Sequence, residues 1–140
     1  MKKNSLSYIM LFVATFMLLF TGSCQKSPIN GDLDGQWQVM DVTPEPSETV
    51  FPERLYICFS LHVCQLTGYD VGVHAEANMQ FDQKKKTLYL DFPNINTEES
   101  IARLAQYGIY NNPVTFDVEL LTSSKLILRD GDVVVTLRKF

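Results

Sequence analysis

The clearest chemistry in the sequence is the acylation of a cysteine thiol near its start. Cys24 follows three small residues, 21–23, and an uncharged apolar run over residues 8–20, with two lysines ahead of that run. This order is typical of a bacterial lipoprotein signal peptide, which is removed so that the cysteine becomes the new N-terminus. Thirteen residues span only about 20 Å as a helix, less than the roughly 30 Å hydrocarbon core of a bilayer. We therefore expect residues 1–23 to be a signal peptide and Cys24 to carry a diacylglycerol thioether.

Histidine, cysteine and carboxylate side chains raise the question of a zinc site. His62, Cys64, His74 and Glu76 all lie on the more polar faces of two long alternating stretches. If these stretches pair as a hairpin with His62 opposite His74, the group has the donor types that zinc accepts. No compact ligand spacing supports such a site. A polar outer face is the preferred interpretation, and we expect no metal.

The sequence offers little for catalysis. It contains no Gly-x-Ser-x-Gly turn, phosphate-binding glycine loop or His-Glu-x-x-His motif. Cys64 and His74 have the types of a nucleophile and a base, but no third, orienting group is identifiable. Asp117 and Glu119 alternate with apolar residues, which indicates a solvated strand face and not an acid–base pair. We expect a protein that is not an enzyme and needs no cofactor.

The charge balance argues against nucleic acid as a partner. Loss of residues 1–23 leaves 10 basic residues against 16 acidic ones, a formal net charge of −6. Binding to phosphates depends on many cations, whereas the one basic run, Lys84–Lys86, is predicted to be a solvated turn between strands. The 117 remaining residues of the 140 suffice for a single domain with one core.

Two further cysteines, Cys58 and Cys64, would be exposed to an oxidising compartment. They lie six residues apart in the stretch Leu55–Gln65, which alternates like one continuous strand. Their Cα atoms would then be about 20 Å apart, far beyond the roughly 4.4 to 6.8 Å of a disulfide. A bridge would require a break in that strand, so we expect two free thiols that act as small apolar residues.

Alternation of apolar and polar residues with a period of two predicts strands along most of the chain. In the first of two long stretches, Leu55–Gln65, the residues Phe59, Leu61 and Val63 share one face. The Asp130-Gly131 pair predicts a tight hairpin turn between the last two strands. The other predicted strands cover residues 36–42, 71–81, 88–92, 114–120, 125–129 and 133–140.

One short helix is predicted near residues 97–107, with Thr97 as its N-cap, acids in its first turn and Gly108 at its end. Seven strands, or eight if the stretch 55–65 bends, favour an all-β, antiparallel up-and-down barrel. A two-sheet sandwich is the structural alternative. The polar residues 24–32 are predicted to be a flexible tether, and residues 33–140 the barrel domain.

With the strands placed, Gly35-Gln36-Trp37 resembles the Gly-x-Trp signature of lipocalins. In that family the tryptophan packs across one end of the barrel, and an arginine of the last strand lies over its ring. The resemblance assigns these roles to Trp37 and Arg138. A guanidinium over an indole gains about 0.5 to 2 kcal/mol of cation–π energy and covers apolar surface.

The whole mature chain is similar to the small lipocalin-like lipoproteins of Bacteroides-type bacteria. The resemblance depends on the signal peptide together with the segments 33–37, 61–66, 123–128 and 138–140. No activity is assigned to that group, so the resemblance implies none for this chain. The chain departs from true lipocalins because it is shorter, its helix lies in mid-chain, and no helix follows the last strand.

These observations predict a non-enzymatic lipoprotein that is held in the outer membrane by lipid on Cys24 and faces the periplasm, with surface exposure left open. A binding module would hold a small apolar molecule among inward side chains. The alternative is a structural or interaction protein whose filled barrel docks an envelope partner. The candidate ligand-binding residues are Phe59, Leu61, Val73, Met79 and Phe116.

Overall fold

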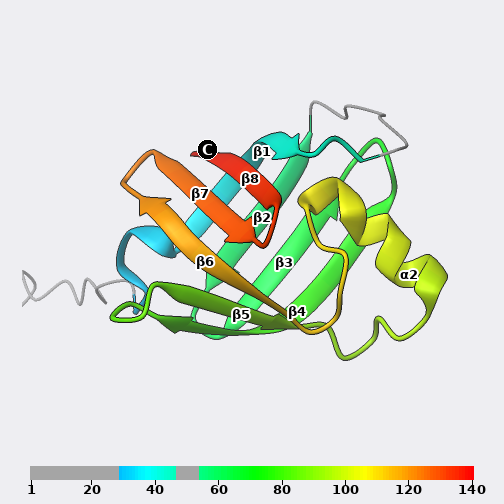
Figure 1. The fold of residues 1–140 in the computed structure, drawn as a ribbon, viewed down its shortest axis with the longest axis horizontal. Coiled ribbons are helices and arrows are strands. Elements are labelled where there is room, and N and C mark those ends of the chain that lie inside the picture. The colour runs from blue at the N-terminus through cyan, green and yellow to red at the C-terminus, as the bar shows by residue number, and fades with distance from the viewer. Residues whose placement is uncertain (1–28, 47–53) are drawn as a thin grey trace, which may run out of the picture.

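Eight strands form one closed antiparallel barrel, in which each strand pairs with the next along the chain and β8 pairs with β1 (Figure 1). This computed structural model describes residues 29–46 and 54–140, so the expected signal peptide and Cys24 lie outside the described residues. The predicted up-and-down barrel is confirmed. Its strands are β1 (Gly35–Thr43), β2 (Leu55–Ser60), β3 (Val63–Gly68), β4 (Val73–Asp82), β5 (Thr87–Asp91), β6 (Val114–Leu121), β7 (Lys125–Asp130) and β8 (Val133–Lys139).

The eighth strand arises because the stretch 55–65 is not one strand. Leu61 has a φ of 55°, and the chain reverses at Leu61 and His62 to pair β2 with β3. The reversal changes which residues face inward, because Phe59 lies opposite Cys64 in the new pair. Cys64 is therefore buried, while Leu61 and Val63 are exposed. The prediction that Leu61 and Val63 share the inward face of Phe59 is wrong from this turn onward.

Alternate residues of each strand fill the barrel with apolar side chains. On β4 the first four inward residues, Val73, Ala75, Ala77 and Met79, are buried, and the residues between them are exposed. The same period recurs on the other strands, which is the pattern of a sheet with one face on the core and one in water. The largest fully buried side chains of the described ranges are those of Trp37, Tyr107, Phe59, Phe92 and Phe116.

The chain enters the barrel through a short 3-10 helix, η1 (Gly31–Leu33). Asn30 is buried, and its Nδ2 donates to the Leu61 carbonyl at 2.9 Å and to Asp34 Oδ1 at 2.6 Å. Asn30, which falls inside the segment expected to be tether, therefore contacts the barrel. We call this end of the barrel, with the turns at residues 61–62, 83–86 and 122–124, the N-terminal end.

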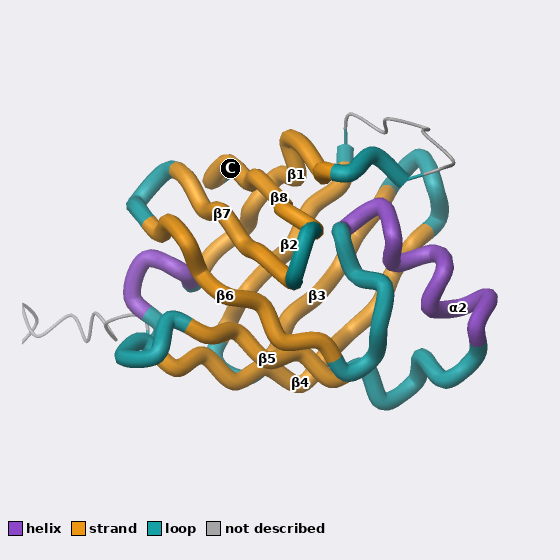
Figure 2. Tube along the Cα trace, viewed as in Figure 1, coloured by secondary structure: helices purple, strands orange, loops and turns teal. Residues whose placement is uncertain are grey.

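The opposite end is crossed by residues 92–113, which we call the covering segment (Figure 2). It contains helix α2 (Glu98–Ala102), continued by a 3-10 helix, η2 (Arg103–Tyr107). The helix predicted near residues 97–107 is thus confirmed, although its second half is wound as a 3-10 helix and not as an α-helix. We call this the covered end of the barrel. In the part of the chain that the structure describes, no helix has the length and apolar character needed to cross a bilayer.

Candidate functional site

The two ends of the covering segment are fastened to each other by one side chain. Asn112 Oδ1 accepts from the Phe92 backbone N–H at 2.9 Å. Its Nδ2 donates to the carbonyls of Phe92 at 2.8 Å and Ile95 at 2.6 Å. Because the amide uses its acceptor and both donor hydrogens, it satisfies backbone groups that would otherwise be left without partners where the segment leaves and rejoins the barrel.

Helix α2 begins with the predicted cap. The Thr97 hydroxyl accepts from the Ser100 N–H at 3.2 Å, and Ser100 Oγ accepts from the Thr97 N–H at 3.1 Å. This reciprocal capping box satisfies free N–H groups of the first turn. Gly108 ends η2 with a φ of 73°, so the left-handed backbone there suits glycine.

Gly108 also allows the covering segment to lie directly against the barrel wall. A Cβ at this position would be 2.3 Å from Val135 Cγ2 and 3.5 Å from Val42 Cγ1. Leu104, Tyr107 and Ile109 are buried beside it. The segment therefore closes the covered end by close packing against β1 and β8.

The Tyr107 hydroxyl is a buried polar group at this end. A Cβ at Gly68 would be 2.9 Å from Tyr107 Oη and 2.9 Å from Leu55 Cδ2, which places the hydroxyl beside β2 and β3. Tyr107 Oη has no hydrogen-bond partner among the described residues. Burial raises the pKa of Tyr107, so the group stays a neutral phenol. An unpaired buried hydroxyl costs free energy, which a hydrogen-bond acceptor placed here would recover.

The barrel wall is incomplete next to α2. β5 pairs with β4 only over the residues opposite Asn78–Asp82, so the first half of β4, 73–77, has no β5 neighbour. The covering segment lies there instead and leaves a pocket of about 310 Å³. Its apolar lining includes the inward-facing Val73 and Ala75, with Ile95 and Leu104 from the covering segment. The pocket thus reaches from the surface to the inner face of β4.

Charged and polar groups lie around the mouth of this pocket. His74 comes from β4, and Glu99 and Arg103 come from the covering segment. Arg103 Nη2 donates to Glu99 Oε1 at 3.2 Å, with both side chains largely exposed. An apolar floor with a few polar groups at the rim is the usual composition of a small-molecule site, and the volume lies at the lower limit of such sites.

The predicted ligand-binding residues do not gather around this pocket. Phe59, Val73, Met79 and Phe116 are buried in the barrel core, and of these only Val73 lines it. Leu61 lies at the N-terminal end with its side chain 56% exposed, because the turn at residues 61–62 removes it from the inward face. The assignment of Leu61 to a ligand cavity is wrong.

The predicted Trp37–Arg138 pair is also wrong, by one residue. Trp37 is fully buried, as expected, but the cation over its ring is Lys139, with Nζ 4.9 Å from the ring centroid. Lys139 pairs with Trp37 across β8 and β1, whereas Arg138 pairs with Gln38 and donates to its Oε1 at 2.9 Å. Successive strand residues point to opposite faces, so Arg138 lies on the outside.

The polar groups considered for zinc or catalysis are dispersed. His74 lies opposite Thr67 and not opposite His62, because the turn at residues 61–62 shifts the pairing of β3 with β4. Glu76 accepts from Gln65 Nε2 at 2.8 Å on the outer face. In residues 29–46 and 54–140, no group of three or more potential metal ligands is found.

The cysteines lie on adjacent strands but on opposite faces. Cys58 is half-buried on the outside opposite Gln65, and Cys64 is buried inside opposite Phe59. The break in the strand that a bridge would require is present, yet both thiols are free because their side chains point apart. Burial raises the pKa of Cys64, with a smaller effect from Cys58, so its thiol stays protonated.

Asp117 and Glu119 are exposed on β6, as predicted for a solvated face. Glu119 forms an ion pair with Arg129, and Asp117 lies opposite Arg129 in the pairing of β6 with β7. The residues that the sequence did not single out are Ala75, Arg103, Tyr107 and Asn112. Their roles depend on where the covering segment packs, which no local pattern indicates.

Comparison with known proteins agrees with this architecture. Residues 17–140 match the family model of a lipocalin-like domain. The chain belongs to the lipocalin-like family. The predicted family resemblance is thus confirmed. No curated protein matches the chain.

Two solved structures share the lipocalin-like barrel. A lipocalin-like protein from Bacteroides uniformis ATCC 8492 is 22% identical, with a TM-score of 0.57 over 79% of this chain and 100% of that one. An uncharacterized protein from Bacteroides eggerthii DSM 20697 is 18% identical, with a TM-score of 0.53 over 77% of this chain and 99% of that one. At these identities the likeness shows the fold.

Proposed function

We propose that this lipocalin-like protein binds a small, mainly apolar molecule at the covered end of its barrel. The observation that carries the proposal is the pocket of about 310 Å³ beside α2, whose lining includes Val73 and Ala75, two buried residues that face the barrel interior. Lipocalin-like barrels are generally binding folds without enzymatic activity, which supports a non-catalytic role.

The rim of the pocket favours a ligand with one anionic group. Arg103 already pairs with Glu99, but an exposed pair of this spacing on a helix contributes only about 0.3 to 0.5 kcal/mol. A ligand carboxylate or sulfonate can therefore compete for Arg103 at little cost. The apolar part of the ligand would lie against Val73, Ala75 and Leu104.

The protein acts, in this proposal, as a lipoprotein of the cell envelope. Support comes from the sequence of residues 1–24, in which a charged start, an apolar run and small residues precede Cys24. Acylation of Cys24 with several chains would hold the protein in the outer membrane, on the periplasmic side, where one chain alone binds reversibly. A Cys24→Ala variant is expected to be released from the membrane fraction by a high-salt wash, which screens binding by surface charge, and retention as firm as that of the parent would contradict anchoring.

Ligand binding is tested with 1-anilinonaphthalene-8-sulfonate, an apolar fluorophore with one anionic group. We expect saturable binding to the chain from Cys24 onward. His74→Trp, which places a large ring at the pocket mouth, is expected to weaken binding about tenfold or more, because steric overlap of a few atoms costs about 1 to 3 kcal/mol. Gln80→Trp is the matched control, since Gln80 is exposed on the same strand and the same face but does not line the pocket.

Equal affinity of the two tryptophan variants, or no saturable binding at all, would contradict the proposed site. The second outcome would favour the alternative of a filled barrel that docks an envelope partner. One observation supports that alternative: Phe59, Met79 and Phe116 fill the middle of the barrel with about 1% of each side chain exposed.

A further inference from the structure

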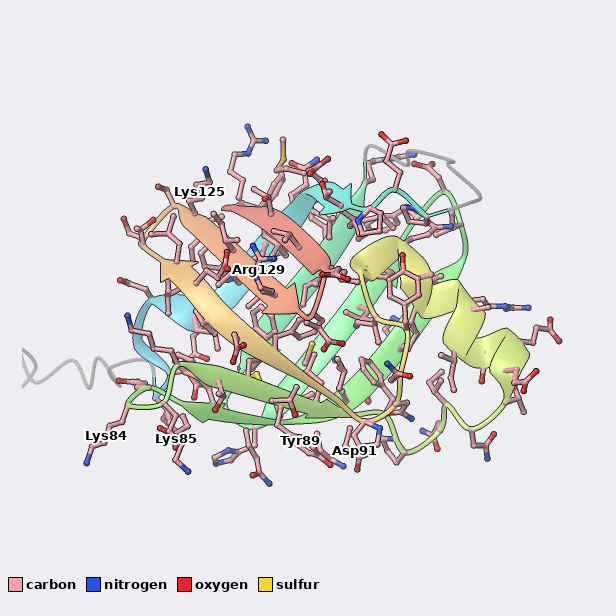
Figure 3. All side chains as sticks on the ribbon, viewed as in Figure 1. Lys84, Lys85, Tyr89, Asp91, Lys125 and Arg129 are labelled. Carbon is pink, nitrogen blue, oxygen red and sulfur yellow. The ribbon has the colours of Figure 1, made fainter. Side chains whose placement is uncertain are left out.

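The lysines that lie in the described ranges are all at one end of the barrel. Lys84, Lys85 and Lys86 form the turn between β4 and β5, Lys125 begins β7 and Lys139 ends β8. All five lysines of the described ranges are therefore at the N-terminal end. Figure 3 shows Lys84, Lys85 and Lys125 projecting from this end, with Arg129 farther along the barrel.

Acidic side chains gather at the opposite end. They come from the turns of the covered end and from the covering segment, whereas the basic residues there, Arg54 and Arg103, each form an ion pair with an acid. The barrel thus has opposite charge at its two ends, although the whole chain has a formal net charge of −4. The acids at or near the covered end are Glu45, Asp70, Asp91, Glu98, Glu99, Asp130 and Asp132.

The acids of the N-terminal end are mostly engaged by neighbours. Asp82 Oδ1 accepts from the backbone N–H groups of Lys84 and Lys85 at 3.0 Å each. Asp34 accepts from Asn30, and Glu119 is paired with Arg129. Asp32 is exposed. At this end the five lysines and Arg138 outnumber the four acids, Asp32, Asp34, Asp82 and Glu119, so the end carries a net positive charge.

Apolar side chains are exposed at the same end. Leu61 is 56% exposed at the tip of the turn between β2 and β3, Ile29 is exposed beside η1, and Leu120 is exposed near the end of β6. A leucine with a φ of 55° is strained, and such strain concentrates at functional positions. Basic and apolar residues on one face are the combination that binds the interface of an anionic bilayer.

We propose that the N-terminal end of the barrel is a membrane-binding surface that lies on a bilayer containing anionic phospholipid. The proposal rests on the proposed lipid at Cys24, because only five residues separate Cys24 from Asn30, and the six residue-to-residue steps between them extend to about 20 Å at most. β4, with ten residues, extends about 30 Å toward the covered end. The tether therefore keeps the N-terminal end near the bilayer, and the ligand pocket faces away from it.

The affinity of the barrel for the bilayer surface is measured on protein that has no lipid on Cys24, so that it is separate from anchoring. The chain from Cys24 onward, with Cys24→Ala, is sedimented with phosphatidylcholine vesicles that do or do not contain phosphatidylglycerol. We expect binding only with phosphatidylglycerol, and weaker binding as salt rises. Each lysine near such a surface contributes roughly fivefold, so Lys84→Gln with Lys85→Gln is expected to weaken binding about 25-fold.

The matched control removes two charges from the other side of the molecule. Arg54→Gln with Arg103→Gln, both at the covered end, lowers the net charge by the same amount, and we expect vesicle binding to stay within about twofold of the parent. Thermal unfolding shows whether each variant is folded. No binding to phosphatidylglycerol vesicles, or an equal loss in both double variants, would overturn the proposal.

The orientation is tested on the full lipidated chain in vesicles with bromine-labelled acyl chains, which quench nearby tryptophan. Leu61→Trp is expected to be quenched, whereas Tyr69→Trp, exposed in the turn between β3 and β4 at the covered end, is not. Equal quenching would refute the orientation. Because cosedimentation of the same lipidated protein reports anchoring separately, failure of the membrane surface is distinguishable from failure of lipid attachment.

Discussion

Lys139 is predicted to stabilise the barrel much more than its neighbour Arg138. Its Nζ donates to the carbonyls of Asp32 at 2.7 Å and Asp34 at 2.6 Å, and lies 4.9 Å from the centroid of the Trp37 ring. Lys139→Met keeps most of the apolar stem but removes the charge and all three interactions. Arg138→Met removes one exposed hydrogen bond, to Gln38.

The expected magnitudes differ severalfold. At a half-buried site, each charged hydrogen bond contributes about 1 kcal/mol, and the cation–π contact about 0.5 to 1 kcal/mol. Lys139→Met is therefore expected to lower the free energy of unfolding by about 2.5 to 3 kcal/mol. For Arg138→Met the expected loss is under about 0.5 kcal/mol, as for most surface substitutions.

Urea unfolding followed by tryptophan fluorescence is the direct assay. Trp37 is the single tryptophan of the chain and is fully buried, so its emission reports on the end of the barrel that Lys139 covers. The shift of the urea midpoint, at an unchanged slope, gives the change in free energy. A loss for Arg138→Met as large as that for Lys139→Met would refute the assignment of Lys139 as the tryptophan's cation.

Three further predictions concern the covering segment and the thiols. Gly108→Ala should lower the free energy of unfolding by about 2 to 4 kcal/mol, measured by urea unfolding, because it combines a left-handed backbone with a clash against Val135. Asn112→Ala should lower it by about 2 to 3 kcal/mol and speed amide hydrogen exchange in the covering segment, since three hydrogen bonds are lost. In native protein, iodoacetamide should alkylate Cys58 faster than the buried, protonated Cys64, as peptide mass mapping would show, and comparable rates would contradict the placement of these thiols.

Much of the barrel follows from local sequence because one face of each strand is buried. On β4 the alternation of Val73, Ala75, Ala77 and Met79 with polar residues specifies both the strand and its inward face. The cap at Thr97 is equally local, since it depends on residues three apart. Where the structure depends on the alternation of apolar and polar residues within one strand, or on one short motif, the sequence predicts it correctly.

The turn between β2 and β3 could not be predicted from such local patterns. Leu61 and His62 are not residue types that favour tight turns with a positive φ, as glycine and asparagine are. Leu61 also continues the apolar–polar alternation of the strand before it. The available signals were the unusual length of the predicted strand and Leu66, which is inward although it breaks the alternation of Phe59 and Leu61. Missing this turn by itself misplaced Leu61 and the histidine pairing.

The candidate site was less predictable because it is made by a long connection. Ala75 and Leu104 line the same pocket only because β5 ends early and the covering segment returns over β4. The choice of Arg138 over Lys139 likewise required the pairing of β8 with β1, which sets which of two adjacent residues faces inward. Contacts between distant segments, not local preferences, decide these features.

Native mass spectrometry of the full chain, purified from its own envelope, tests ligand binding at the covered end most directly. We predict a small-molecule adduct that is retained by Gln80→Trp and lost or strongly reduced in His74→Trp. An adduct that is unaffected by His74→Trp, or a protein that carries no small molecule in any of the three forms, would contradict the pocket beside Val73 and Ala75 as the binding site.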